Sequence, residues 1–262
     1  MEITGKTKIM LMLADPVEHI RGSAMLTRLL NEAGHDIACS PLHVKPEDLG
    51  AAVASMRLFR NVVGFGVTIP HKIGVRRFID EETAQARLVG SVNFVRRNAD
   101  GSLIGDNLDG AGFVDGLKRS DIALRGKRVL QLGAGGAGRS IAFSIAEAGA
   151  AALGICNRTR KKAVDLARAV QTARPACRTY AADSDPTGFD LIVNTTSMGM
   201  KPGDPLMIDP ERLAASMAVA EIIMSPEMTP LLTEAQKRGC RIGLGRNMLE
   251  EQVKRLEAFF RL

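Results

Sequence analysis

The chain contains few aromatic residues. Of its 262 residues none is Trp, one is Tyr and nine are Phe. Proteins that bind single-stranded nucleic acids stack bases on such side chains along a basic groove. The net charge of +6 comes from basic residues that are scattered, with no run of them interleaved with aromatics. We therefore expect no nucleic-acid partner, and an anionic small molecule explains the positive charge as well.

Cysteine is also scarce, and the four cysteines show no metal-binding spacing. They are far apart and form no C-x-x-C pair: Cys39, Cys156, Cys177 and Cys240. This spacing suggests neither a zinc site nor a disulfide framework. We expect buried free thiols, which suit a reducing compartment, and no metal.

Long hydrophobic runs are absent. The apolar run Lys8–Ala14 stops at Asp15 and is too short for a signal-peptide core or a membrane span. With 45% apolar and 24% charged residues, the composition is typical of a globular protein. We expect a cytoplasmic protein with no membrane partner, a monomer or homodimer, and a length that allows two domains.

The first hundred residues alternate short apolar runs with helical patterns, which predicts an α/β fold with a largely parallel sheet. Strands are predicted at 9–14, 37–44 and 62–69, and a hairpin at 91–97 and 102–105. A helix is predicted from Ser23, as N-cap, to Ala33, and another opens at Pro46.

A second α/β domain is predicted to begin near residue 110. A helix at about 110–119 precedes the apolar strand 127–132. Later strands are predicted at about 152–157, 177–182, 190–195, 218–224 and 241–244. The amphipathic segment 247–262 predicts a final helix that returns to the first domain. The expected domains are 1–109 plus about 245–262, and 110–244.

A glycine-rich turn follows the strand 127–132 and opens a helix, which is the context of a dinucleotide-binding site. Its glycines let a pyrophosphate approach backbone N–H groups at the positive end of a helix dipole. The alternative is a tight turn that needs positive φ. The residues predicted to contact the cofactor here are Gly133, Gly135, Gly136, Ala137 and Gly138.

The next strand ends in Asn157-Arg158-Thr159-Arg160, without the acidic residue that NAD sites usually carry there. A carboxylate would repel a 2′-phosphate, whereas Arg158 and Arg160 can hold one through planar, charge-assisted hydrogen bonds. NADP is therefore the predicted cofactor. The neighbouring Lys161 and Lys162 fit better as a solvated helix start.

Two segments upstream of the glycine turn indicate an enzyme. Thr68–Lys72 lies at a strand's C-terminal end, where parallel α/β sheets place ligands. Asn107-Leu108-Asp109 adds a carboxylate before the first helix of the second domain. The ammonium of Lys72 and the carboxylate of Asp109 are a candidate proton-transfer pair. His71 is interpreted as structural, because neighbours in an extended segment point in opposite directions.

Several ordered motifs resemble the shikimate dehydrogenase family over nearly the whole chain. They are 67–72 (Val-Thr-Ile-Pro-His-Lys), 90–93 (Gly-Ser-Val-Asn), 107–110 (Asn-Leu-Asp-Gly), the glycine turn, 157–159 (Asn-Arg-Thr), 194–199 (Asn-Thr-Thr-Ser-Met-Gly), 229–232 (Thr-Pro-Leu-Leu), and Met248-Leu249 followed by Gln252.

The resemblance implies a substrate domain, a Rossmann-type NADP domain and reversible hydride transfer between NADP and a ring hydroxyl, as in a shikimate 3-dehydrogenase of aromatic amino acid or quinate metabolism. It implies that Lys72 and Asp109 are catalytic. It also implies that Thr68, Asn93 and Gln252 bind ring hydroxyls. Cofactor contacts are implied for Asn157, Arg158, Thr159, Thr195 and Met248.

The chain departs from the family at positions that hold the substrate carboxylate. The His-Ser-x-Ser-Pro signature is replaced by His19-Ile20-Arg21-Gly22-Ser23, and an expected Tyr by Met224. Three further replacements are Gly66 for Asn, Phe94 for Thr and Leu108 for Thr. Each unmade hydrogen bond to a buried carboxylate costs about 1–3 kcal/mol. We hypothesise that Arg21, with Ser23, binds the anionic group instead; the alternative is that Arg21 faces solvent.

Shikimate, quinate or a close cyclic hydroxy acid is therefore the expected substrate. A methylene-tetrahydrofolate dehydrogenase-like activity shares the two-domain plan, but the Lys72 and Asp109 segments argue against it. The remaining alternative is an NADP-responsive binding protein with little catalytic activity.

Overall fold

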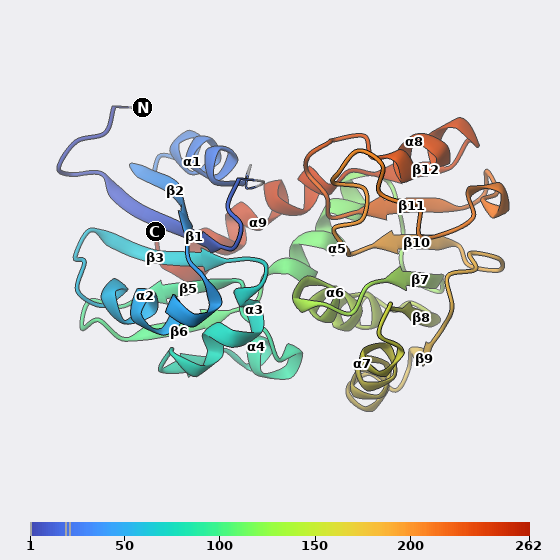
Figure 1. The fold of residues 1–262 in the computed structure, drawn as a ribbon, viewed down its shortest axis with the longest axis horizontal. Helices are drawn as coiled ribbons and strands as arrows, with labels where there is room; N and C mark the ends of the chain where they lie inside the picture. Colours follow the sequence, from blue (N-terminus) through green and yellow to red (C-terminus); the bar gives the residue numbers. More distant parts are fainter. Residues whose placement is uncertain (1, 19, 21) are drawn as a thin grey trace. The chain divides into compact units, whose positions relative to one another are not determined.

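The computed structural model describes residues 2–18, 20 and 22–262. The chain forms two compact units. The first comprises Met1–Leu108 and Gln252–Leu262, and the second comprises Asp109–Glu251. Each unit contains one six-stranded sheet (Figure 1).

The first unit alternates strands and helices, as the sequence predicts. Its strands are β1 (Lys8–Ala14), β2 (Ile37–His43), β3 (Val62–Val67), β4 (Glu81–Glu82), β5 (Phe94–Arg97) and β6 (Leu103–Asp106). Its helices are α1 (Gly22–Glu32), α2 (Leu49–Met56), α3 (His71–Gly74) and α4 (Ala84–Val89), with short 3₁₀ turns at Pro46–Asp48 and Val75–Arg77.

The sheet of the first unit has the order β2-β1-β3-β5-β6-β4. Strand β1 is parallel to both β2 and β3, whereas β5 and β6 form the predicted antiparallel hairpin. The hydrophobic core lies under β1, β3 and β5, around Phe65, Val53 and Val95. The ends of β1, β2 and β3 therefore open at one edge of the sheet, where the candidate residues lie.

Three local predictions need correction in this unit. Strand β3 ends at Val67 rather than residue 69, because the chain turns into α3. The segment around His71 is consequently a helical turn and not extended. Ser23 is not an N-cap, because it already lies inside α1 and its buried Oγ makes no hydrogen bond to any residue that the structure describes.

The second unit is a doubly wound α/β fold. Its strands are β7 (Arg128–Leu132), β8 (Ala152–Cys156), β9 (Arg178–Ala181), β10 (Leu191–Asn194), β11 (Ala218–Glu221) and β12 (Arg241–Gly243). Its helices are α5 (Asp109–Arg119), α6 (Gly136–Glu147), α7 (Arg160–Ala173) and α8 (Pro230–Lys237), with a 3₁₀ turn at Pro210–Arg212.

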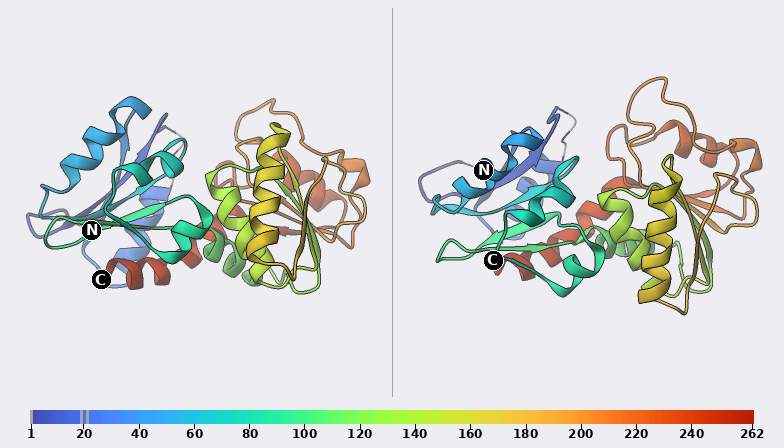
Figure 2. Two further views of the ribbon diagram at one scale, coloured as in Figure 1. Left: turned by 90° about the horizontal axis from the view of Figure 1, so that it is seen from below. Right: turned by 60° about the horizontal axis from the view of Figure 1, so that its bottom comes forward.

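All strand pairs in the second sheet are parallel, in the order β12-β11-β10-β7-β8-β9. The chain runs outward from β7 through β8 to β9, then returns beside β7 and runs the other way. Helices lie on both faces of the sheet (Figure 2), which is what right-handed crossovers running in opposite directions from one strand produce. The switch between β7 and β10 is where such sheets bind ligands. The strand predicted at 218–224 ends at Glu221, so Met224 lies in the loop beyond it.

The last helix, α9 (Gly245–Phe260), is divided between the two units. Its residues from Gln252 onward belong to the first unit, and those before Gln252 belong to the second. Arg96 on β5 donates to the carbonyl oxygen of Phe259 over 2.6 Å, and His35 pairs with Glu257 over 2.9 Å. These bonds attach the end of the chain to β5 and to the turn after α1.

In the portion of the chain described, no helix has the length and apolar character needed to cross a membrane.

Candidate active site and cofactor site

Lys72 lies on the turn that follows β3. Val67 ends the strand, and the N–H of Thr68 donates to the carbonyl oxygen of Leu13 over 3.0 Å. The carbonyl oxygen of Lys72 accepts from Val92 N–H over 2.8 Å, which ties the turn to the segment before β5. The Lys72 and Thr68 side chains are half-buried. Backbone bonds thus hold the lysine at the C-terminal edge of the first sheet.

His71 has a structural partner. Its side chain is 2% exposed, and its Nε2 lies 2.7 Å from the carbonyl oxygen of Val44. The ring therefore joins α3 to the loop after β2, although the extended backbone from which this role was inferred is absent.

Asn93 and Asn107 organise the segments on either side of the hairpin. The buried Oδ1 of Asn93 accepts from Leu108 N–H over 2.9 Å. Asn107 donates from Nδ2 to the Ser91 hydroxyl over 2.9 Å and to the Ser91 carbonyl oxygen over 3.2 Å. Thr68 and Lys72 come from segment 68–72 and Asn93 from segment 91–93, and hydrogen bonds join these two segments to each other and to segment 106–108 within the first unit.

Asp109 is the first residue of α5 and belongs to the second unit. Its side chain is 3% exposed. A carboxylate at a helix N-terminus is stabilised by the helix dipole. The next residue, Gly110, donates its N–H to the Ser140 hydroxyl over 2.9 Å, so α5 is fastened to α6 at this point.

Two predicted substrate-binding residues of the first unit have buried polar atoms without a hydrogen-bond partner among the residues described. They are the hydroxyl of Ser23, in a residue 4% exposed, and Nε2 of Gln252, in a residue 1% exposed. Such orphaned atoms are costly and call for an explanation, of which a ligand is one. Arg21, with His19, lies outside the described residues.

Three departures from the family pattern pack as apolar core residues. A methyl group on Gly66 would lie 2.3 Å from the Met12 sulfur and 3.0 Å from Cε1 of Phe94, so a larger residue here would require the Met12 side chain to move. Phe94 and Leu108 are 2% and 8% exposed. At these positions the chain fills the first unit with apolar atoms, where the family carries polar side chains.

The glycine turn of the second unit is shaped for close approach of a ligand. Gly133 has a φ of +109°, which favours glycine. A methyl group on Gly138 would lie 2.7 Å from the Gly133 carbonyl oxygen, whereas one on Gly135 would meet nothing within 4 Å. Gly135 is the N-cap of α6 and offers no side-chain cap. The open space beside Gly135 at a helix N-terminus fits a pyrophosphate.

Hydrogen bonds from three neighbouring strands fix this turn. Asn157, after β8, accepts from Ala134 N–H over 3.1 Å, and the Thr195 hydroxyl, after β10, donates to the carbonyl oxygens of Leu132 and Gly133 over 2.9 and 3.2 Å. Gln131 in β7 donates to the carbonyl oxygens of Gly133 and Gly138. The Arg158 and Thr159 side chains are exposed beyond β8, where they can reach a ligand.

Glu221 is a buried acid that the sequence did not single out. It ends β11, is 1% exposed, and accepts at Oε1 from Asn194 Nδ2 over 3.0 Å. Burial raises the pKa of this carboxyl, an effect that hydrogen bonds to Asn194 and Thr229 oppose. Asn194 also donates to Met198 and accepts from Thr196, so Glu221 supports the loop after β10.

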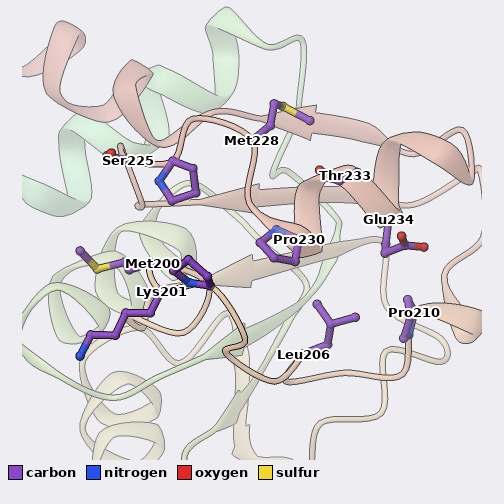
Figure 3. A pocket seen from close by; sticks show the side chains of 12 residues that line it. Met200, Lys201, Leu206, Pro210, Ser225, Met228, Pro230, Thr233 and Glu234 are labelled. Carbon is purple, nitrogen blue, oxygen red and sulfur yellow. The ribbon is translucent and has the colours of Figure 1, made fainter.

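Two hollows lie in the second unit. A small one of about 10 Å³ is lined by Glu221, Gly243 and the half-buried Met248, among others. A larger open one of about 720 Å³ lies between the loop after β10 and the start of α8 (Figure 3). Met200, Lys201, Leu206, Met228 and Pro230 line it, and none of these is a predicted site residue.

Among the residues described, no three or more His, Cys, Asp or Glu side chains gather in a way that could hold a metal ion.

Comparison with known proteins identifies the family. The family model for the shikimate dehydrogenase substrate binding domain matches residues 12–95, and that for shikimate / quinate 5-dehydrogenase matches residues 117–198. The second description gives the ring position as 5, so the expected position 3 is wrong.

Individual relatives cover nearly the whole chain. Shikimate dehydrogenase (NADP(+)) of Geobacter metallireducens is 38% identical over 96% of this chain and 90% of its own. The crystal structure of a shikimate dehydrogenase in complex with NADP+ matches with a TM-score of 0.90 and 31% identity, covering 100% of this chain and 92% of that one.

Ligand-free 5-ketofructose reductase of Gluconobacter sp. strain CHM43 matches with a TM-score of 0.85 and 33% identity, covering 99% and 95%. Since the two family models together match more than half of the chain, and since relatives align over almost all of it, the chain belongs to the shikimate dehydrogenase family.

Proposed function

We propose that the chain is an NADP-dependent oxidoreductase that transfers a hydride reversibly between NADP and a ring hydroxyl of shikimate, quinate or a related cyclic hydroxy acid. The observation that carries this proposal is the open space beside Gly135 at the N-terminus of α6, in a chain that is 38% identical to an NADP-dependent shikimate dehydrogenase. The reported relatives are named as dehydrogenases or a reductase, so a non-catalytic binding protein receives no support.

Oxidation of an alcohol removes a hydride from carbon and a proton from oxygen, and NADP, when bound, accepts the hydride. We assign the proton to Lys72, whose Nζ relays it between the hydroxyl and solvent. Asp109 is assigned as the ionic partner of the lysine. The lysine stands on a turn fixed by backbone hydrogen bonds, which suits a group that must be held in one place.

The residues proposed to bind substrate are Thr68, Asn93, Gln252, Ser23 and Arg21. Thr68, Asn93 and Gln252 would bind ring hydroxyls. The orphaned Nε2 of Gln252 supports this, since a hydroxyl oxygen would accept from it. Ser23, with its orphaned hydroxyl, and Arg21 would bind the anionic group. The residues proposed to contact the cofactor are Gly133, Gly135, Gly136, Ala137, Gly138, Asn157, Arg158, Thr159, Thr195 and Met248.

A substrate panel tests the proposal. The full chain is assayed by NADPH absorbance with shikimate and quinate in the oxidative direction, and NAD is run beside NADP. We expect NADP-dependent turnover of at least one cyclic hydroxy acid. Absence of activity with every substrate in both directions would refute the enzymatic assignment.

A second candidate substrate is a polyhydroxy ketone without a carboxylate. The 33% identity to a 5-ketofructose reductase favours it, together with the loss of the family's carboxylate-binding hydroxyls. The panel therefore includes 5-ketofructose with NADPH. Faster turnover of this ketose than of any acid would select the second candidate and remove the role assigned to Arg21.

Replacing Arg158 with Gln is expected to weaken NADP binding about tenfold, with NAD affinity changed less than about twofold. Arg158 is exposed, so solvent and salt screen part of its attraction to a 2′-phosphate. Isothermal titration with both nucleotides measures the two affinities. Lys162→Gln removes the same charge from the exposed start of α7 and serves as the matched control. An equal loss for NAD and NADP would show that Arg158 does not read the phosphate.

Replacing Arg21 with Ala is expected to raise KM for the best acidic substrate by about tenfold or more, because a bidentate ionic contact is lost. Steady-state kinetics measures this change. Arg28→Ala is the control, since Arg28 lies on α1 with a side chain 61% exposed and forms a long 3.9 Å ion pair with Glu32. An unchanged KM for Arg21→Ala would show that the guanidinium of Arg21 does not bind the substrate.

We place the enzyme in the cytoplasm as a monomer or homodimer. Free cysteines support a reducing compartment: Cys177 and Cys240 are buried thiols, and burial raises the pKa of each.

A further inference from the structure

A glutamine occupies the strand that leads into the cofactor turn. Gln131 is fully buried in β7, and its register partners are Val193 on β10 and Ile155 on β8. Strands buried on both faces of a parallel sheet are usually apolar throughout. An amide at this position therefore needs a specific reason.

The side-chain amide of Gln131 joins the two ends of the glycine turn. Its Nε2 donates over 2.8 Å to the carbonyl oxygen of Gly133, at the start of the turn, and over 2.8 Å to that of Gly138, in the first turn of α6. An NH₂ group has two hydrogens, and both are used. Because only a donor can satisfy two carbonyl oxygens, these bonds also fix the orientation of the amide.

The other atom of this amide is left without a partner. Oε1 of Gln131 is buried and accepts no hydrogen bond from the residues described. Leucine or methionine would fill the same space without an orphaned acceptor, so an aliphatic side chain would serve packing better. The amide is thus explained by its two donated bonds rather than by strand stability.

We propose that Gln131 is a positioning residue for the NADP pyrophosphate. It holds the carbonyl oxygens of Gly133 and Gly138 toward the sheet, which fixes the separation and tilt of the two ends of the turn. The N–H groups between them, around Gly135, then keep the geometry that the ligand requires. Thr195, which directly follows β10, donates to the same Gly133 oxygen, so the turn is held from both β7 and the end of β10.

This inference rests on the proposed use of NADP but is tested separately from it. In Gln131→Met the chain length is kept and both donated bonds are lost. We expect the Kd for NADP+ to rise about tenfold, with kcat at saturating cofactor changed less than about twofold. The melting temperature should stay equal or rise, because the orphaned acceptor is removed too. Isothermal titration, steady-state kinetics and thermal melts of the full chain give the three readouts.

The matched control is Gln171→Met. Gln171 on α7 also makes two side-chain bonds, accepting from Thr179 N–H over 2.7 Å and donating to the Pro175 carbonyl oxygen over 3.2 Å. Its loss is expected to leave NADP+ affinity unchanged. A purely structural role for Gln131 predicts instead a lower melting temperature with unchanged affinity in Gln131→Met.

Two results would overturn the inference. One is an NADP+ affinity within about twofold of the parent chain in both Gln131→Met and Gln131→Leu. The other is failure of both variants to fold, because the inference requires the amide to be dispensable for folding. If the parent chain itself does not bind NADP+, the proposed function fails instead, which distinguishes the two.

Discussion

Lys72→Ala is expected to lower kcat for the best substrate by about 10²- to 10⁴-fold, the range typical for loss of a general acid or base. The Kd for NADP+ should change by less than about twofold, because the cofactor turn lies in the other unit. The turn that carries the lysine is held by the Lys72 carbonyl oxygen and the Thr68 N–H, so the variant should fold. Single-turnover kinetics with NADPH and isothermal titration separate the chemical step from cofactor binding.

Lys72→Arg sharpens this test. Arginine keeps the positive charge but does not give up its proton near neutral pH. If Lys72 relays a proton, the arginine variant should be nearly as slow as the alanine variant. If the lysine acts only as a fixed charge, arginine should restore much of the rate. A kcat within about tenfold of the parent chain in Lys72→Ala would contradict the catalytic assignment altogether.

Sequence patterns predicted most elements because they depend on local periodicity and turn residues. The helix α1, the hairpin of β5 and β6, and the strands of the second sheet all appear within a few residues of their predicted bounds. Errors occur where the chain leaves a strand at a functional edge. Apolar residues continue beyond the last ladder bond of β3 and β11, as at Ile69 and Ile222, so hydrophobicity alone places these ends too late.

The buried polar side chains that hold the loops of the site by hydrogen bonds were harder to predict than the motifs of the site. Gln131 and Glu221 sit in strands whose neighbours are apolar, and nothing in their immediate sequence reveals what they bond. Gln131 meets Gly138 only because the glycine turn folds back over β7, and Glu221 meets Asn194 only because β10 and β11 are adjacent. Such roles depend on sheet order, which a single sequence does not state. The one signal in the sequence that could have identified these two residues is a polar residue inside an otherwise apolar strand.

The glycines of the cofactor turn differ in what surrounds them. This difference separates a glycine that the fold requires from one that leaves space for a ligand. Gly138 is packed against the protein: its added methyl group would lie 2.7 Å from both the Gly133 carbonyl oxygen and the Thr195 hydroxyl. Gly135 faces open space, and its φ of −80° and ψ of −170° are accessible to alanine. Protein atoms therefore explain glycine at 138, whereas at 135 no protein atom lies close enough to require it and the free space can take a ligand.

Gly135→Ala is accordingly expected to weaken NADP+ binding by about 100-fold while the melting temperature stays equal or rises. The methyl group would occupy the space of the pyrophosphate, and overpacking of this kind costs up to about 3 kcal/mol. Alanine in an accessible backbone conformation also restricts the unfolded chain, which stabilises by about 0.4–1 kcal/mol. Isothermal titration with NADP+ and thermal melts of the ligand-free chain measure the two effects.

Gly138→Ala is the contrasting variant. Its methyl group collides with backbone that cannot move without displacing the turn, so both the melting temperature and NADP+ affinity should fall. If Gly135→Ala instead binds NADP+ within about threefold of the parent chain, the pyrophosphate does not pass over this residue. The dinucleotide site would then have to lie elsewhere on the second unit. A lower melting temperature in Gly135→Ala would show instead that glycine is needed there as the N-cap of α6.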